Sequence, residues 1–104
     1  MKLHQRLDAW KLSFAFVKEV YIITAKFPSE EKFSLISQLR RAAVSVPTNI
    51  AEGAARQTKN EFRQFLYIAL GSSSELDTLL QLSLELGFVE KDTVDILLKI
   101  RNHF

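Results

Sequence analysis

The chain has 104 residues, of which 47% are hydrophobic and eight are Phe, and its formal net charge is +2. This length suits a single domain spanning residues 1–104, and so small a charge does not by itself indicate a nucleic-acid ligand. The absence of cysteine excludes disulfides and thiolate metal sites, and no charge-free run approaches the ~20 apolar residues that a membrane span needs.

The first expected element is a helix over about residues 8–26, because apolar residues recur three or four positions apart on two neighbouring faces. The first face carries Trp10, Phe14, Val17, Tyr21 and Ala25, and the second carries Leu12, Phe16, Val20, Ile23 and Phe27. Pro28 ends this helix, since its ring disfavours the helical conformation in the preceding residue. One neighbouring helix cannot cover so much apolar surface.

The second helix, at residues 33–53, is apolar or small around most of its circumference. Its spacing continues in phase through Pro47 to Ile50, so we predict one helix with a bend at Pro47 rather than two helices. Gly53 is expected to close the helix in the left-handed conformation. A helix with so little polar surface must be covered on several sides, which places it at the centre of a bundle or between subunits.

The third helix begins at a capping box, in which Thr58 and Glu61 satisfy each other's backbone donors. It runs to Gly87, about 42 Å at 1.5 Å per residue, and its small residues at 69–74 permit a close neighbour. A fourth amphipathic helix follows residues 88–89 and runs to the last residue. Four helices, short connections and no strand pattern predict an all-α, antiparallel up-down-up-down four-helix bundle.

Antiparallel packing of the second and third helices would place Arg40 and Arg41 beside the small residues 71–72, about one turn from Glu75. We predict that one of these arginines pairs with Glu75 or with a carboxylate of a neighbouring chain. The whole predicted polar seam comprises Arg40, Arg41, Asn49, Glu52 and Glu75. The alternative is that these charges simply point into water, as most helix charges do.

The same topology brings the starts of the first and third helices to the ends of the second and fourth. Cations would outnumber acids at that end, and acids would predominate at the other. The predicted basic end comprises Lys2, Arg6, Lys11, Arg56, Lys59, Arg63, Lys99 and Arg101. Such a face suits phosphates, aided by the positive end of the third helix. The alternative is a hydrated charge asymmetry without a ligand, because aromatic residues do not interleave with the cations.

No group of residues suggests catalysis or a cofactor. His4 and His103 lie near the two termini, without the Glu-x-x-His or His-x-x-x-His spacing of a bundle metal site. The glycines belong to no phosphate-binding loop, because none sits in a strand-loop-helix context. We therefore expect no metal, no cofactor and no enzymatic activity, since acid, base and nucleophile nowhere converge.

Residues 38–53, QLRRAAVSVPTNIAEG, closely resemble bacterial four-helix-bundle proteins first noticed as reading frames inside intervening sequences of 23S rRNA genes. The resemblance extends to residues 7–10, 65–72 and 86–89. It implies an antiparallel four-helix bundle that assembles as a ring-like homopentamer. It also implies kinship with the accessory variability determinant proteins of diversity-generating retroelements, which are basic pentamers that engage nucleic acid and a reverse transcriptase.

Three functions follow from these observations. The first is a non-enzymatic oligomeric scaffold that binds RNA or another nucleic acid weakly through its basic end. The second is a protein adapter whose partner docks on the oligomer without nucleic acid. The third, which the missing catalytic residues disfavour, is a hydrolase or nuclease. Because residues 1–10 lack the apolar core of a secretory signal, we expect a soluble cytoplasmic protein with no membrane partner.

Overall fold

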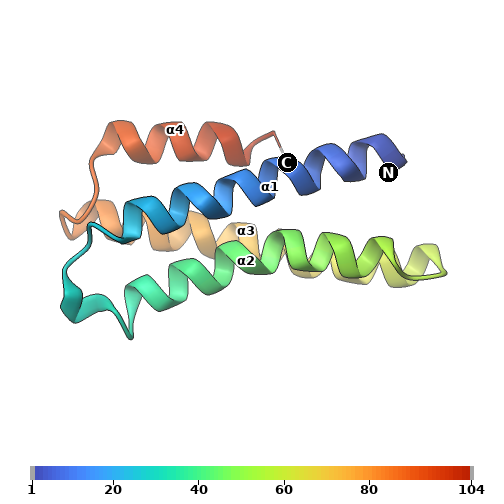
Figure 1. The fold of residues 1–104 in the computed structure, drawn as a ribbon, viewed down its shortest axis with the longest axis horizontal. Coiled ribbons are helices and arrows are strands. Elements are labelled where there is room, and N and C mark those ends of the chain that lie inside the picture. The colour runs from blue at the N-terminus through green and yellow to red at the C-terminus, as the bar shows by residue number, and fades with distance from the viewer. Residues whose placement is uncertain (1, 104) are drawn as a thin grey trace.

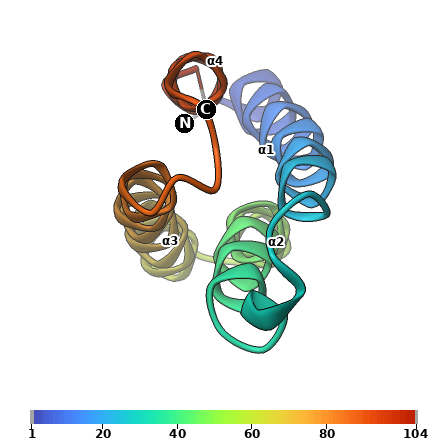
Figure 2. The same ribbon diagram turned by 90° about the vertical axis from the view of Figure 1, so that its left-hand side faces the viewer.

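The computed structural model describes residues 2–103, apart from the side chain of His4. Its elements are α1 (Leu3–Thr24), a 3-10 turn (Ser29–Glu31), α2 (Leu35–Ala54), α3 (Lys59–Glu85) and α4 (Lys91–Arg101). Consecutive helices lie side by side, and their connections alternate between the two ends of the molecule (Figure 1). Viewed end-on, the four helices occupy four corners (Figure 2). The all-α class and the four-helix bundle are thus confirmed, and residues 2–103 contain no strand.

The core lies between the four helices, and the largest fully buried side chains come from all of them. They are Phe16, Leu39, Leu76, Leu80 and Leu97. Within the protomer α2 occupies a corner rather than the centre, because it packs against α1 and α3 just as α1 and α3 each pack against two neighbours (Figure 2). Its predicted position between subunits stays a prediction. Among the described residues, α1 and α3 have no Cα atoms within 8 Å of each other, so they occupy diagonal corners.

α2 runs without interruption through Pro47, as the phase of its apolar spacing predicted, and Pro47 itself is buried. The prediction for Gly53 is wrong, because this residue lies inside the helix and is buried. A Cβ atom at Gly53 would stand 3.0 Å from both Phe62 Cδ1 and Phe65 Cβ. Glycine is therefore required here by the close approach of α2 and α3, not by the backbone conformation.

The ends of α3 illustrate both standard capping devices. At its start Thr58 is the predicted N-cap, since the backbone N–H of Glu61 donates to Thr58 Oγ1 at 3.1 Å. The Glu61 carboxylate accepts from the Thr58 hydroxyl at 2.9 Å rather than from its backbone N–H, so only one half of the predicted capping box forms. At its end the left-handed residue is Gly87, with φ 78°. Phe88 N–H donates to the Ser83 carbonyl at 3.0 Å and Gly87 N–H to the Leu84 carbonyl at 3.0 Å, which together form a Schellman motif.

α1 begins at Leu3, earlier than the expected start near residue 8. The Gln5 side chain explains this extension, because its Oε1 accepts the Lys2 backbone N–H at 2.9 Å and so caps the first turn. Lys2, Gln5 and Arg6 are consequently fixed at a helix terminus rather than in an unstructured leader.

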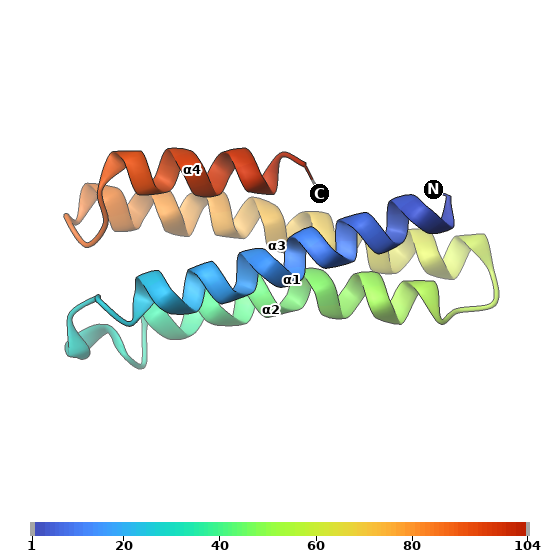
Figure 3. The ribbon, with the colours of Figure 1, turned by 45° about the horizontal axis from the view of Figure 1, so that its top comes forward.

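α4 is much shorter than its neighbours, with 11 residues against 27 in α3. Its C-terminal end lies beside the middle of α1 and α3, well short of the end at which the N-terminus lies (Figure 3). The prediction that the fourth helix reaches the starts of the first and third is therefore wrong. At that end the described residues contribute α1, α2 and α3 but no fourth helix, and we call the fourth corner there the open corner (Figure 3).

Candidate nucleic-acid interface

A cleft of about 560 Å³ lies between the starts of α1 and α3, at the open corner of the bundle. We call it the basic cleft, and it is lined by Lys2, Gln5, Arg6, Lys59, Phe62, Arg63 and Leu66. Four of these residues are cations, and none of the described lining residues is acidic. Cations held close together without counter-charges create a positive potential that attracts anions.

Arg6 is fixed against the wall of this cleft by an aromatic ring. Its guanidinium carbon lies 4.1 Å from the centroid of the Phe62 ring, which is a cation–π contact. Arg6 Nε is buried and has no hydrogen-bond partner among the described residues, so this part of the guanidinium faces the protein and only its outer nitrogens can meet an anion in the cleft.

The remaining predicted cations of the basic end have other surroundings. Arg56 forms an ion pair with Glu52 at 3.4 Å and lies over the Phe65 ring. Lys11 and Lys99 are exposed and do not line the basic cleft. The structure thus brings together Lys2, Arg6, Lys59 and Arg63, while Lys99, on α4, lies away from them.

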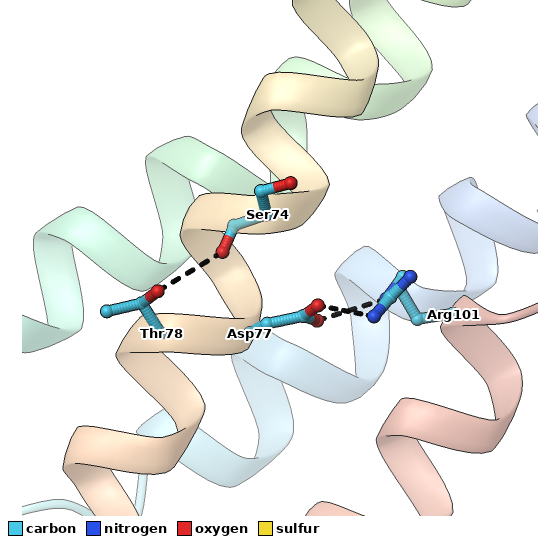
Figure 4. Close-up of polar contacts among 4 residues, drawn as sticks. All are labelled: Ser74, Asp77, Thr78 and Arg101. Atoms are coloured by element: carbon cyan, nitrogen blue, oxygen red, sulfur yellow. Dashed lines mark hydrogen bonds and ion pairs between the residues drawn. The ribbon is translucent and has the colours of Figure 1, made fainter.

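Arg101 is engaged inside the protomer. Its Nε donates to Asp77 Oδ1 at 3.0 Å and its Nη2 donates to Asp77 Oδ2, so the guanidinium grips the carboxylate with two hydrogen bonds (Figure 4). Asp77 belongs to the middle of α3, one turn after Ser74, whose carbonyl accepts from Thr78. This pair ties α4 to α3. Because Asp77 compensates its charge, Arg101 adds little to the positive charge of the basic end.

The predicted polar seam is not assembled within a protomer. Arg40 Nε donates to Thr24 Oγ1 at 2.9 Å, and its guanidinium lies over the Tyr21 ring, so this residue faces α1. The α3 side of α2 is marked instead by Ser45, which Ser72 approaches at 2.7 Å. Arg40 and Ser45 are five residues apart on α2, and at ~100° per residue their side chains point about 140° apart around the helix axis. Arg40 therefore lies on the side of α2 away from α3 and cannot reach Glu75.

The other seam residues also bond locally. Asn49 Nδ2 donates to the Ser45 carbonyl at 2.7 Å, and Glu52 pairs with Arg56. Arg41 and Glu75 are both exposed, and no ion pair joins them within the described part of the chain. The intramolecular pairing is therefore wrong, whereas pairing with a neighbouring chain's carboxylate stays a prediction.

A second surface of interest is largely apolar and runs along the junction of α1 and α2, with Lys32, Arg40 and Arg41 beside its last hollow. We call it the α1–α2 strip, and it comprises Leu3, Leu7, Trp10, Phe14, Tyr21, Phe33 and Val44. Three hollows follow one another along it, the first two sharing Trp10 and the last two sharing Val44. Phe33 is 89% exposed and Phe14 is 49% exposed. Contiguous apolar surface of this kind is typical of protein–protein contacts.

The structure also bears on the expectations about membranes and metals. No helix among residues 2–103 combines the length and the apolar character needed to cross a bilayer. Nor do the described residues contain a group of three or more His, Asp or Glu side chains that could ligate a metal ion.

The family model described as "23S rRNA-intervening sequence protein" matches residues 5–103. The chain belongs to this family. Its fold is similar to the crystal structure of a protein of unknown function from the S23 ribosomal protein family of Bacteroides thetaiotaomicron, with a TM-score of 0.84. The two chains are 19% identical, and the match covers 94% of this chain and 88% of the other. Among curated proteins nothing matches.

For this 23S rRNA-intervening sequence protein, sequence reasoning missed three residues of the basic cleft, Gln5, Phe62 and Leu66. Phe62 and Leu66 share one helical face with the core residues of α3, so their spacing predicted burial alone. Gln5 could have been recognised from the sequence, because a Gln three residues after the N-cap residue is typical of a capping box. Recognising it would have moved the start of α1 to the right place.

Proposed function

We propose that this antiparallel bundle is a non-enzymatic, cytoplasmic scaffold that assembles as a ring-like homopentamer and binds RNA weakly through its basic end. The observation that supports RNA binding most strongly is the basic cleft, which has four cations and no described acid. The family description refers to an intervening sequence of 23S rRNA, so RNA is the first nucleic acid to test.

Assembly is supported by the α1–α2 strip, which a single protomer leaves uncovered. Burying apolar surface contributes roughly 25 cal/mol per Å², so contact between copies along the strip would stabilise an oligomer. The strip does not define the number of copies, and five is what the family resemblance implies. Native mass spectrometry tests this part, and a monomer at micromolar concentration would contradict it.

RNA binding is tested by retention of labelled RNA at increasing salt concentration. If the cations bind RNA phosphates, the logarithm of the association constant falls linearly with the logarithm of the salt concentration. The triple variant Arg56→Glu, Lys59→Glu, Arg63→Glu should abolish retention. No binding by the unmodified protein at low salt would reject RNA as the ligand.

A protein adapter is the second candidate, and a groove between α1 and α4 favours it. Ile22 and Ile96 line this groove and are 55% and 60% exposed, on a side of the bundle away from the α1–α2 strip. Pull-down with and without nuclease separates the two functions, because a protein partner would survive the nuclease. A metal-supplemented hydrolase and nuclease screen tests the proposed absence of enzymatic activity.

A further inference from the structure

The basic cleft lies in the part of the bundle that α4 does not reach. Beside residues 77–85 of α3, α4 packs between α1 and α3 and occupies the fourth corner of the bundle. The pair Arg101–Asp77 anchors the end of α4 there. Beyond Arg101 the same space continues along α1 and α3 with no helix to fill it (Figure 3). The cleft is therefore concave and bounded on two sides, unlike the exposed helix surface on which most lysines of this chain lie.

Its two walls carry cations and its interior is apolar. Lys2 and Arg6 come from the α1 side, and Lys59 and Arg63 come from the first turns of α3. Between them lie Leu66 and Phe62, and Arg6 stacks on the Phe62 ring. An inorganic anion would satisfy the cations but would leave the apolar surface uncovered.

We propose that the basic cleft is a subsite for one nucleotide of a single RNA strand. Its phosphate lies between the two cationic walls, and its base lies against Leu66 and the Arg6–Phe62 stack. This inference rests on the proposed RNA-binding function and adds to it the form of RNA that is bound.

Single-stranded RNA fits this geometry better than a duplex for a physical reason. Within a duplex the bases are paired and stacked inside, so a protein can contact phosphates, 2′-hydroxyls and base edges but not the faces of the bases. Only a base splayed out from a single strand can enter a cleft of about 560 Å³ and cover its apolar interior. Arg guanidinium planes are among the groups on which such bases stack.

The test compares a short fluorescent single-stranded RNA with a duplex of the same sequence, measured by fluorescence anisotropy at several salt concentrations. Lys59→Gln and Arg63→Gln change exposed residues and should preserve the fold. Lys18→Gln is the matched control, because it removes one exposed cation from α1 outside the cleft. Leu66→Ala removes apolar surface without changing the charge, and its thermal melting shows whether the fold is retained.

We expect the single strand to bind at least about tenfold more tightly than the duplex. Lys59→Gln and Arg63→Gln should each weaken binding and lower the salt slope, by ~0.7 for each phosphate that the variant no longer neutralises. Lys18→Gln should leave both affinity and slope unchanged. A folded Leu66→Ala protein should bind the single strand several-fold more weakly with an unchanged salt slope, which a purely electrostatic surface would not show.

Equal affinity for the two RNA forms would overturn the subsite, as would equal reductions of affinity in Arg63→Gln and Lys18→Gln. RNA binding itself would still stand in both cases. If the unmodified protein binds neither form at low salt, the subsite and the proposed RNA-binding function both fail. In that case binding of an acidic protein to the same cations would be the remaining use of the cleft.

Discussion

Arg101, the last residue of α4, grips Asp77 in the middle of α3 with two parallel hydrogen bonds. The other two ion pairs found among the described residues join side chains only four positions apart in the sequence. The Arg101–Asp77 pair thus differs from them in linking two helices, and it lies at the point where α4 ends.

Asp77→Asn should weaken the docking of α4. Because the two side chains are 29% and 37% exposed, solvent screens the pair, and we expect a decrease of about 1 kcal/mol in the free energy of unfolding. Urea denaturation measures this decrease. The control is Lys91→Gln, which removes an exposed pair with Asp95 at 3.9 Å and should change stability by less than ~0.5 kcal/mol. Equal midpoints for the two variants would show that the pair does not stabilise α4.

Gly53→Ala and Gly71→Ala should have opposite effects on stability. The new methyl group at residue 53 would stand 3.0 Å from Phe62 Cδ1 and 3.3 Å from the Phe62 carbonyl oxygen, so α2 and α3 must separate. We expect a net destabilisation of about 1–3 kcal/mol, despite the better helix propensity of alanine. At residue 71 nothing lies within 4 Å, and alanine should add up to ~1 kcal/mol. Thermal unfolding of the two variants checks both signs.

The sequence predicts the features that depend on one helix at a time. Apolar spacing identified the buried positions Phe16, Val20 and Phe27, and the capping-box pattern identified the start of α3. The role of Gly53 and the partner of Arg101 depend on how two helices lie against each other. The predicted seam failed for the same reason, because the side of α2 that faces α1, where Arg40 lies, is set by packing between helices.

The length of α4 was the second source of error, and it affected the candidate site most. Periodicity alone indicated a helix to the last residue, whereas α4 ends at Arg101, and Phe104 lies outside the described residues. Since the basic cleft occupies the space beyond α4, it could not be inferred from a pattern in which the fourth helix fills the corner. The four cations that line the cleft were all among the predicted basic residues, but Lys99 and Arg101 were added by the same error.

Arg40→Ala should destabilise the protomer, whereas Arg41→Ala should not. Arg40 bridges α2 to α1 through Thr24 Oγ1 and the Tyr21 ring, and removing both interactions should lower the free energy of unfolding by about 1–2 kcal/mol. Arg41 is exposed and has no intramolecular ion pair among the described residues, so its replacement should stay within ~0.5 kcal/mol. Urea unfolding distinguishes the two variants, provided that both are measured at a protein concentration that gives the same oligomeric state. If Arg41→Ala instead lowers the mass of the assembly in native mass spectra, this would support the predicted pairing of Arg41 with a neighbouring chain.

Val44→Asp should break the proposed assembly without unfolding the protomer. Val44 is shared by two of the three hollows of the α1–α2 strip and is 39% exposed, so an aspartate can remain hydrated in an isolated copy. If another copy covers the strip, the carboxylate loses its hydration, and Arg40 and Arg41, which line the same hollow, compensate its charge only in part. We expect a penalty of about 1–3 kcal/mol, so the dissociation constant should rise roughly tenfold or more. Ile96→Asp on α4 is the matched control, because it adds the same charge at an exposed apolar residue outside the strip. Native mass spectra should show smaller species for Val44→Asp alone, and an unchanged mass would mean that the strip is not the contact between copies.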